Sequence, residues 1–197
     1  MNRFIVRLPE SIYKNENLTS YEKIIYAFLC MVFVPYYKFA DKAYVSIEII
    51  IKYMFGENEI SRKDKNECEK AWQGLREKGL LTNSPKDYLV GDNKYFVQIP
   101  IAALQDILCS GLKNKADICI YLMWLVGTFN HKNNVGCQKI EYLAKSVGVS
   151  TRTVQRYNSI LEDMEVIEIV RSDEVVRTNT GFVAKENNRY CISAKYT

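Results

Sequence analysis

The feature that most constrains this chain is an internal repeat, in which the same succession of segments occurs once in each half. An apolar run that ends in proline at residues 4–9 (FIVRLP) is echoed at residues 95–100 (YFVQIP). Apolar stretches of helical length follow at residues 21–29 and 116–124. A succession that occurs twice predicts two copies of one structural unit.

Two further helices are expected in each half. The second pair ends at Gly56 and Gly148, in the manner of C-cap glycines. The third pair begins at Ser61 and Ser150, which suit helix N-caps and lie 89 positions apart. The equal spacing supports the repeat over a chance succession of apolar segments.

A predicted hairpin follows the third helix of each half, as a β-like run and a return strand. The segments are 80–83 with 94–99 in the first half and 166–171 with 189–193 in the second. Three helices followed by a hairpin is the order of a winged-helix domain. We therefore expect an α+β fold, mostly α with small β-hairpins, built from two tandem winged helix-turn-helix domains at residues 1–98 and 99–197.

Residues 140–157 resemble the helix-turn-helix of bacterial regulators and replication proteins. Ala144 is small enough for two helices to cross closely, Gly148 permits a sharp turn, and Val149 fills the space between the helices. The expected buried stripe of the recognition helix is Val154, Tyr157, Leu161 and Met164.

The opposite face of this helix carries the expected DNA contacts. They are Ser150, Thr151, Arg152, Gln155 and Arg156. Arginine bonds bidentately to guanine and glutamine to adenine, with about 1–3 kcal/mol of discrimination for each good pair, and the helix N-terminus suits a phosphate. The alternative is a solvated helix face, because Glu162, Asp163 and Glu165 follow and would repel phosphate.

The equivalent helix of the first half, residues 61–75, is the weaker candidate reader. Its basic start offers Arg62, Lys63, Lys65, Asn66 and Lys70 to DNA, whereas its expected inward face is Cys68, Ala71, Trp72 and Leu75. Acidic residues at Asp64, Glu67 and Glu69 dilute the positive field, so a solvated face remains the alternative.

The loops of the two hairpins are candidate wings that contact the DNA backbone or minor groove. Lys86 is the candidate contact in the first loop. In the second, longer loop the candidate contacts are Arg177 and Lys185, with Arg171 and Arg189 as further candidates at its flanks. An ordinary charged surface loop is the alternative for each of them.

Enzyme chemistry lacks candidate residues, so we expect no enzyme, no metal and no cofactor. The single histidine, His131, lies in a polar stretch without an acid or cysteine spaced as a partner. The sequence contains no phosphate-binding loop, dinucleotide fingerprint or nucleophile elbow. A tyrosine nucleophile that cuts DNA would need a histidine cluster for its metal, and packing explains Tyr26, Tyr53, Tyr121 and Tyr157.

The six cysteines form no C-x-x-C pair, and a reducing compartment fits them best. Four of them lie in apolar patterns, where a thiol serves as a small core residue: Cys30, Cys68, Cys119 and Cys191. The start of the chain lacks a secretory pattern, and its most apolar runs fall short of the ~20 residues that span a bilayer. We therefore expect a cytoplasmic protein with no membrane partner.

The charge balance gives only weak support for a polyanionic partner. The 197 residues include 27 Lys and Arg against 23 Asp and Glu, a net charge of +4. DNA binding can therefore be inferred only from where the charged residues lie, and not from the net charge.

Residues 3–9 with residues 18–26, which carry the pattern LTSYEKIIY, resemble the N-terminal DNA-binding domain of RepA-type plasmid replication initiators and related phage replication proteins. The likeness covers about the first 100 residues. It implies binding of double-stranded DNA at repeated origin sites, often as homodimers, and recruitment of host replication proteins. A second winged helix here stands where those initiators have their recruiting region, which puts recruitment in doubt.

Two other functions are open. A transcriptional regulator would use the same recognition helices but would add an effector pocket or a dimerisation helix, of which the sequence gives no sign. Winged helices also bind proteins, so an interaction scaffold is the alternative outside DNA binding.

Overall fold

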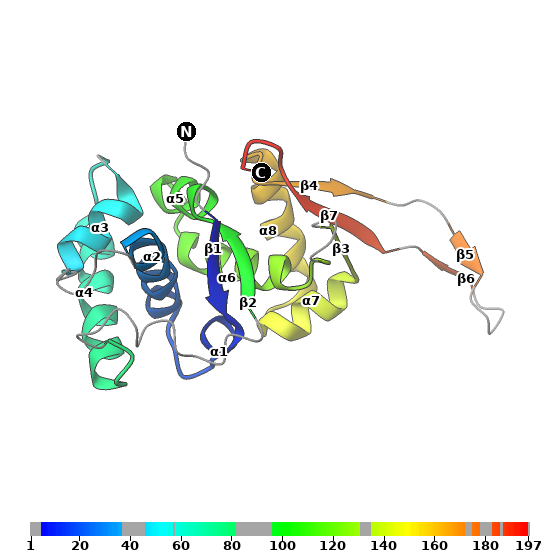
Figure 1. Cartoon of the computed structure of the whole chain (residues 1–197). Helices are drawn as coiled ribbons and strands as arrows, with labels where there is room; N and C mark the ends of the chain where they lie inside the picture. The colour runs from blue at the N-terminus through cyan, green and yellow to red at the C-terminus, as the bar shows by residue number, and fades with distance from the viewer. Residues whose placement is uncertain are drawn as a thin grey trace. The chain divides into compact units, whose positions relative to one another are not determined.

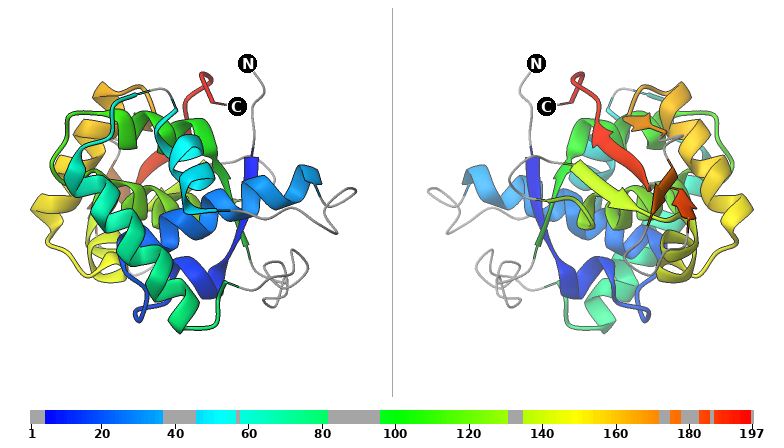
Figure 2. Two further views of the ribbon diagram at one scale, coloured as in Figure 1. Left: turned by 90° about the vertical axis from the view of Figure 1, so that its left-hand side faces the viewer. Right: turned by 90° about the vertical axis from the view of Figure 1, so that its right-hand side faces the viewer.

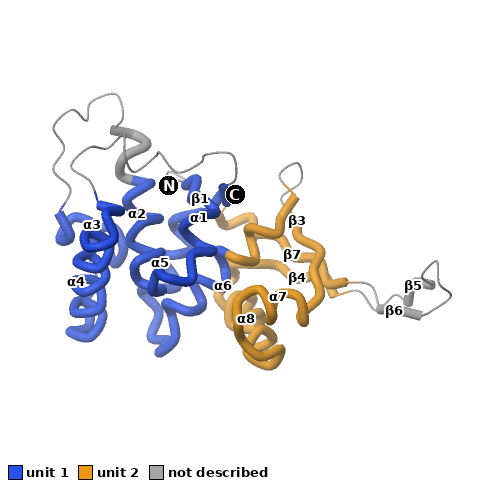
Figure 3. The backbone as a smooth tube through the Cα atoms, turned by 90° about the horizontal axis from the view of Figure 1, so that it is seen from below, with its two compact units in different colours: residues 1–123 blue, residues 124–197 orange. Residues whose placement is uncertain are grey.

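The computed structural model has a mixed α and β fold (Figure 1). It describes residues 5–36, 46–56, 58–81, 96–130, 135–171, 175–177, 183–185 and 187–196. The chain divides into two compact units, residues 1–123 and 124–197 (Figure 3). The expected domain boundary was after residue 98, whereas the division between the units falls within a helix that begins 17 residues later, at Lys115.

Unit 1 contains two short strands and the helices around them. Its elements are β1 (Ile5–Pro9), α1 (Glu10–Tyr13), α2 (Ser20–Tyr36), α3 (Ile47–Phe55), α4 (Arg62–Glu77), β2 (Phe96–Pro100), α5 (Ile101–Cys109) and the larger part of α6 (Lys115–Gly127). The left view of Figure 2 shows α3 leading through a short connection into α4.

The two proline-terminated runs that suggested a repeat are partners in one antiparallel sheet. β1 pairs with β2 from Ile5 opposite Pro100 to Pro9 opposite Phe96. Val6, Leu8, Val97 and Ile99 are buried, as a period of two predicts, while Arg7 and Gln98 between them face solvent. The two runs are therefore the two strands of a single sheet, and not the first strands of two separate sheets.

This pairing corrects the hairpin expected in the first half. Residues 96–99 of the expected return strand pair with β1. Leu80 and Leu81 belong to no strand, and residues 82–83 lie outside the described residues. Local pattern identified a strand here but could not identify its partner, because the partner is about 90 residues away in sequence.

A capping box begins α2. The Thr19 N–H donates to Oε2 of Glu22 at 2.6 Å, and the Glu22 N–H donates to the Thr19 hydroxyl at 3.3 Å. The Glu22 side chain is 3% exposed, and Lys78 Nζ holds its two oxygens at 2.6 and 2.7 Å. Burial raises the pKa of Glu22, but the bonds from Lys78 and Thr19 outweigh burial and lower it.

Gly74 allows α4 to pack closely against α2 at this carboxylate. A Cβ added at Gly74 would lie 2.2 Å from Oε1 of Glu22. Because Lys78 and Thr19 hold the Glu22 carboxylate, it cannot simply turn away. Glycine in this helix interior therefore serves the packing between the helices.

Unit 2 is built around a three-stranded antiparallel sheet. Its elements after α6 are β3 (Val135–Gln138), α7 (Ile140–Val147), α8 (Thr151–Asp163), β4 (Ile167–Val170), β5 (Val175–Arg177), β6 (Val183–Lys185) and β7 (Asn188–Ile192). The strand order is β3-β7-β4, and β5 pairs with β6 (Figure 2, right).

The two strands predicted in the second half are confirmed as β4 and β7, which pair from Ile167 opposite Ile192 to Val170 opposite Arg189. β3, the third strand of the sheet, was not predicted from the sequence. Gly136 in β3 lies against Phe129, because an added Cβ would come within 2.6 Å of the ring. Tyr190 of β7, opposite Gly136, is fully buried.

The helices α4 and α8 end in the same way. The N–H of Leu80 bonds to Leu75 O at 2.9 Å, and the N–H of Val166 bonds to Leu161 O at 2.8 Å. In both turns the preceding residue has a positive φ, 67° at Gly79 and 55° at Glu165. These are the bonds of Schellman-type helix ends.

Replacing Gly74 with alanine is expected to destabilise the protein by about 1–3 kcal/mol. The steric cost of the overlap between the new Cβ and Glu22 is larger than the roughly 1 kcal/mol that alanine gains in helix propensity. Urea unfolding followed by circular dichroism measures the difference. Gly111→Ala is the control, since an added Cβ there has no atom within 4 Å. A Gly74→Ala protein as stable as the wild type would contradict the packing role.

Candidate nucleic-acid interface

The helices α7 and α8 are joined by a tight turn at Gly148. This residue is left-handed, with φ 76°, and its N–H bonds to Ala144 O at 3.0 Å. The Val149 N–H shares the same carbonyl acceptor at 3.0 Å. Leu143 and Ala144 are buried, and Gly148 makes the expected turn, whereas Val149, which was expected to fill the space between the helices, is half-buried.

The N-terminus of α8 carries no negative side chain. Its N-cap Ser150 accepts a hydrogen bond from Thr153 N at 3.1 Å, and the first turn contains no acid. The N–H groups of Thr151 and Arg152 precede the first intrahelical bond, which Val154 donates to Ser150. This end of the helix therefore keeps its positive dipole for an anion.

The inward face of α8 follows the predicted stripe with one addition. Val154, Tyr157 and Leu161 are buried, whereas Met164 is half-buried as the C-cap residue. Asn158, which the predicted stripe did not include, is also buried, at 4% exposure. The remaining side chains that the sequence assigned to DNA are exposed on the opposite face, namely Ser150, Thr151, Arg152, Gln155 and Arg156.

Arg171 was a candidate wing contact, but its guanidinium is bound to Glu162 at the end of α8. Nη1 of Arg171 lies 2.9 Å from Oε1 of Glu162, and Nη2 pairs with Oε2. The pair neutralises one of the acids that argued against phosphate contact by α8. Arg189, the other flanking candidate, is exposed on β7.

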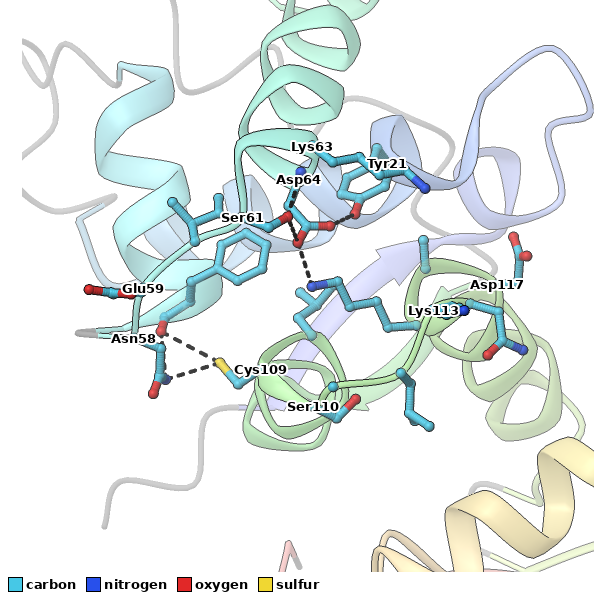
Figure 4. Close-up of a pocket in the computed structure, with 18 residues that line it drawn as sticks. Tyr21, Asn58, Glu59, Ser61, Lys63, Asp64, Cys109, Ser110, Lys113 and Asp117 are labelled. Atoms are coloured by element: carbon cyan, nitrogen blue, oxygen red, sulfur yellow. Dashed lines mark hydrogen bonds and ion pairs between the residues drawn. The ribbon is translucent and has the colours of Figure 1, made fainter.

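The first turn of α4 differs sharply from that of α8, because Asp64 is buried there. The sequence analysis treated Asp64 as one of the exposed acids of α4, but it is 8% exposed. Its Oδ1 accepts from the Tyr21 hydroxyl at 2.6 Å. Its Oδ2 accepts from Ser61 Oγ at 2.6 Å and from Lys115 Nζ at 2.7 Å (Figure 4).

This network sets the ionisation of its members. Burial raises the pKa of Asp64, but hydrogen bonds from Lys115, Ser61 and Tyr21 outweigh burial and lower it. Burial and the bond to Asp64 raise the pKa of Tyr21. Asp64 is therefore a buried carboxylate that occupies the N-terminus of α4, and it joins α4 to α2 and α6 within unit 1.

Further along α4, acids of the same helix compensate two of the five candidate DNA contacts. Lys70 Nζ lies 3.1 Å from Glu67, and Lys65 Nζ lies 4.0 Å from Glu69. The other three candidates, Arg62, Lys63 and Asn66, are exposed. The inward face expected for α4 is buried at Cys68, Ala71 and Leu75, and Trp72 is half-buried.

A cavity of about 480 Å³ lies beside the Asp64 network in unit 1. The side chains that Figure 4 labels around it include Asn58, Ser61, Lys63, Cys109 and Lys113. They come from the α3–α4 connection, the start of α4, the last residue of α5 and the segment between α5 and α6. This pocket was not predicted, because its walls come from segments about 50 residues apart in the chain.

All six cysteines are described, and all are free thiols. Cys30, Cys68 and Cys119 are buried as expected, whereas Cys191 is only half-buried. Burial raises the pKa of Cys30 and of Cys68 to about 12 and also raises that of Cys119. These three thiols therefore stay protonated and unreactive near neutral pH.

Three of the four tyrosines assigned to packing are buried, namely Tyr26, Tyr121 and Tyr157. Tyr53 is different, because it is 39% exposed on α3. Tyr53 lies outside the buried face of α3, which is formed by Ile50, Met54 and Phe55.

Several expectations fall at the limits of the described residues. His131 and Lys86 lie outside them. Arg177 and Lys185 are described only in their backbone, at the ends of the paired strands β5 and β6. Among the described side chains, no three acids, cysteines or histidines gather as metal ligands. No helix in the described part of the chain combines the length and apolar character needed to cross a bilayer.

No protein-family model, curated protein or solved structure matches the chain in the three comparisons with known proteins.

Replacing Asp64 with asparagine is expected to lower the free energy of unfolding at pH 7 by about 1–3 kcal/mol, since it leaves Lys115 without its buried counter-charge. The native pKa of Asp64 lies below its usual unfolded value of ~3.9. Its stabilisation is therefore fully present above that pH and is lost as the pH falls through the native pKa.

Urea unfolding at pH 7 and near pH 3 tests this expectation, because the difference in stability between wild type and Asp64→Asn should be smaller in acid than at pH 7. Glu67→Gln, which removes an exposed ion pair, is the matched control and should change stability by about 0.5 kcal/mol or less. A constant difference between wild type and Asp64→Asn at both pH values would contradict the buried ion pair.

Proposed function

We propose that the protein binds double-stranded DNA in a sequence-dependent manner, with α8 as its recognition helix. The order α6, β3, α7, α8, β4 and β7, with the sheet order β3-β7-β4, supports reading unit 2 as a winged helix-turn-helix domain. In such domains the exposed start of the recognition helix enters the major groove. For unit 1 we propose that α2, α3 and α4 are the three helices of a second winged helix-turn-helix domain.

The observation that carries the proposal is the electrostatic difference between the first turns of α4 and α8. In α4 a buried carboxylate, Asp64, already occupies the N-terminus. In α8 the first turn has no acid, and Arg152 and Arg156 are exposed. A phosphate-lined groove is attracted to the second arrangement and less so to the first.

We assign DNA binding mainly to unit 2 and a supporting role to unit 1. Arg62 and Lys63 remain candidate backbone contacts, because they are exposed at the start of α4. Lys65 and Lys70 are weaker candidates, since Glu69 and Glu67 lie beside them.

Plasmid or phage replication initiation is the process we propose, on the resemblance of residues 3–26 to RepA-type initiators. Homodimerisation on repeated sites and contact with host replication proteins belong to that same proposal. The cavity beside Asp64 favours a second candidate, a transcriptional regulator with a small effector, because such regulators need a pocket of this kind.

Replacing both Arg152 and Arg156 with alanine is expected to weaken DNA binding about 10-fold or more at physiological salt. Fluorescence anisotropy with a random duplex and with DNA that flanks the gene, across a salt series, measures the loss. Wild-type binding should fall with increasing salt and should prefer the flanking DNA.

The matched control removes two exposed cations from α4, by Arg62→Ala and Lys63→Ala, and should weaken binding less. Wild-type protein that binds neither duplex at low salt would reject DNA binding and would favour an interaction scaffold instead.

A further inference from the structure

The cavity beside the Asp64 network in unit 1 has the size and the fixed walls of a small-molecule site. Its volume of about 480 Å³ lies within the ~300–1,000 Å³ typical of such sites. The Lys115–Asp64 ion pair, at 2.7 Å, joins the start of α6 to the start of α4, and the Tyr21 hydroxyl donates to the same carboxylate (Figure 4). The walls are therefore held in place by contacts within the protein.

One wall of the cavity, residues 111–117, carries backbone N–H groups that lack acceptors. From Gly111 to Asp117, no backbone N–H donates a hydrogen bond to any described residue. The next N–H along the chain, that of Ile118, donates the first bond of α6, to the Asn114 carbonyl at 3.1 Å. Successive free N–H groups at the start of a helix attract anions.

The side chain of Asn114 lies in the same wall and also lacks a partner. Its Nδ2 is buried, and among the described residues it is the one buried side-chain nitrogen or oxygen without a hydrogen bond. Leaving a buried amide N–H unpaired costs about 1–3 kcal/mol. Because Asn114 lines the cavity, a ligand acceptor that meets its amide after a small rotation would remove this cost.

Two lysines add positive charge to the cavity, and its two uncompensated acids lie apart from each other. The side chains of Lys63 and Lys113 are exposed and form no ion pair or hydrogen bond within the described part of the chain. The acids are Glu59 and Asp117, which Figure 4 shows at opposite ends of the labelled group. Asp117 also accepts a hydrogen bond from Ser20 Oγ at 3.3 Å. An anion that binds between these acids would meet Lys113 and the N–H groups that follow α5.

We propose that this cavity binds a small organic anion. The N–H groups of residues 111–115, the Asn114 amide and the Lys113 ammonium bind its acid group. Its apolar part contacts Ile60 and Leu112, which line the cavity and are half-buried. The site gives the effector pocket suggested above a ligand class, and it does not depend on DNA binding by α8.

Titration of the isotope-labelled full chain with benzoate, benzamide and phenyl phosphate, followed by amide NMR spectra, tests the proposal. Benzoate and benzamide have nearly the same shape, but only benzoate is charged. Benzoate should shift the signals of residues 111–115 and of the Asn114 side-chain amide saturably. It should bind about 10-fold or more tightly than benzamide, because charge-assisted hydrogen bonds are about twice as strong as neutral ones. Comparison with phenyl phosphate distinguishes a carboxylate site from a phosphate-ester site.

Variants of the wall test the same site without touching the Asp64 network. Lys113→Met and Asn114→Ala should each weaken benzoate binding about 3-fold or more, the effect of losing one hydrogen bond. Arg76→Met removes an exposed cation of α4 that does not line the cavity, and it should bind benzoate as the wild type does. Urea unfolding of each variant checks that the fold is retained.

Equal affinities for benzoate and benzamide would overturn the anion site. Signals that shift only outside residues 111–115, at the start of α8 for example, would overturn it as well, and so would the absence of any saturable shift with benzoate and phenyl phosphate. These outcomes leave DNA binding by α8 untouched, because the duplex titrations measure that function separately.

Discussion

Unit 1 depends on the pairing of β1 with β2, because this contact joins residue 5 to residue 100 and holds everything between them in one unit. Closing so long a loop costs chain entropy, and burial of apolar surface must offset that cost. The inner face of the pair buries Val6, Leu8, Val97 and Ile99. The helices α2, α3 and α4 then pack within a loop whose two ends are fixed.

The two units differ in where their ionisable side chains lie. Unit 1 buries carboxylates and neutralises them at once, Glu22 with Lys78 and Asp64 with Lys115. These pairs fix where α2, α4 and α6 lie. At the start of α8 in unit 2 the cations remain at the surface without acids in the turn. Similar helical patterns thus serve internal packing in one unit and recognition, as we propose, in the other.

The mixed α and β fold and most helices could be predicted because their signals are local. The cap at Ser150, the left-handed Gly148 and the apolar period of α8 all lie within about ten residues of the features they define. The pairing of β1 with β2, the burial of Asp64 and the capture of Arg171 by Glu162 depend on distant or spatial partners. No property of Asp64 itself distinguishes it from the exposed acids nearby, since Lys115 is 51 positions away.

The matching ends of α4 and α8 place different residues in the same helix-terminal turn. The same left-handed turn is occupied by Gly79 in one half and by Glu165 in the other. A glutamate accepts that conformation at a cost of about 1 kcal/mol, whereas glycine accepts it freely. The turn after α8 therefore carries backbone strain that the turn after α4 avoids, so two helix ends with the same hydrogen bonds differ in stability because of one side chain.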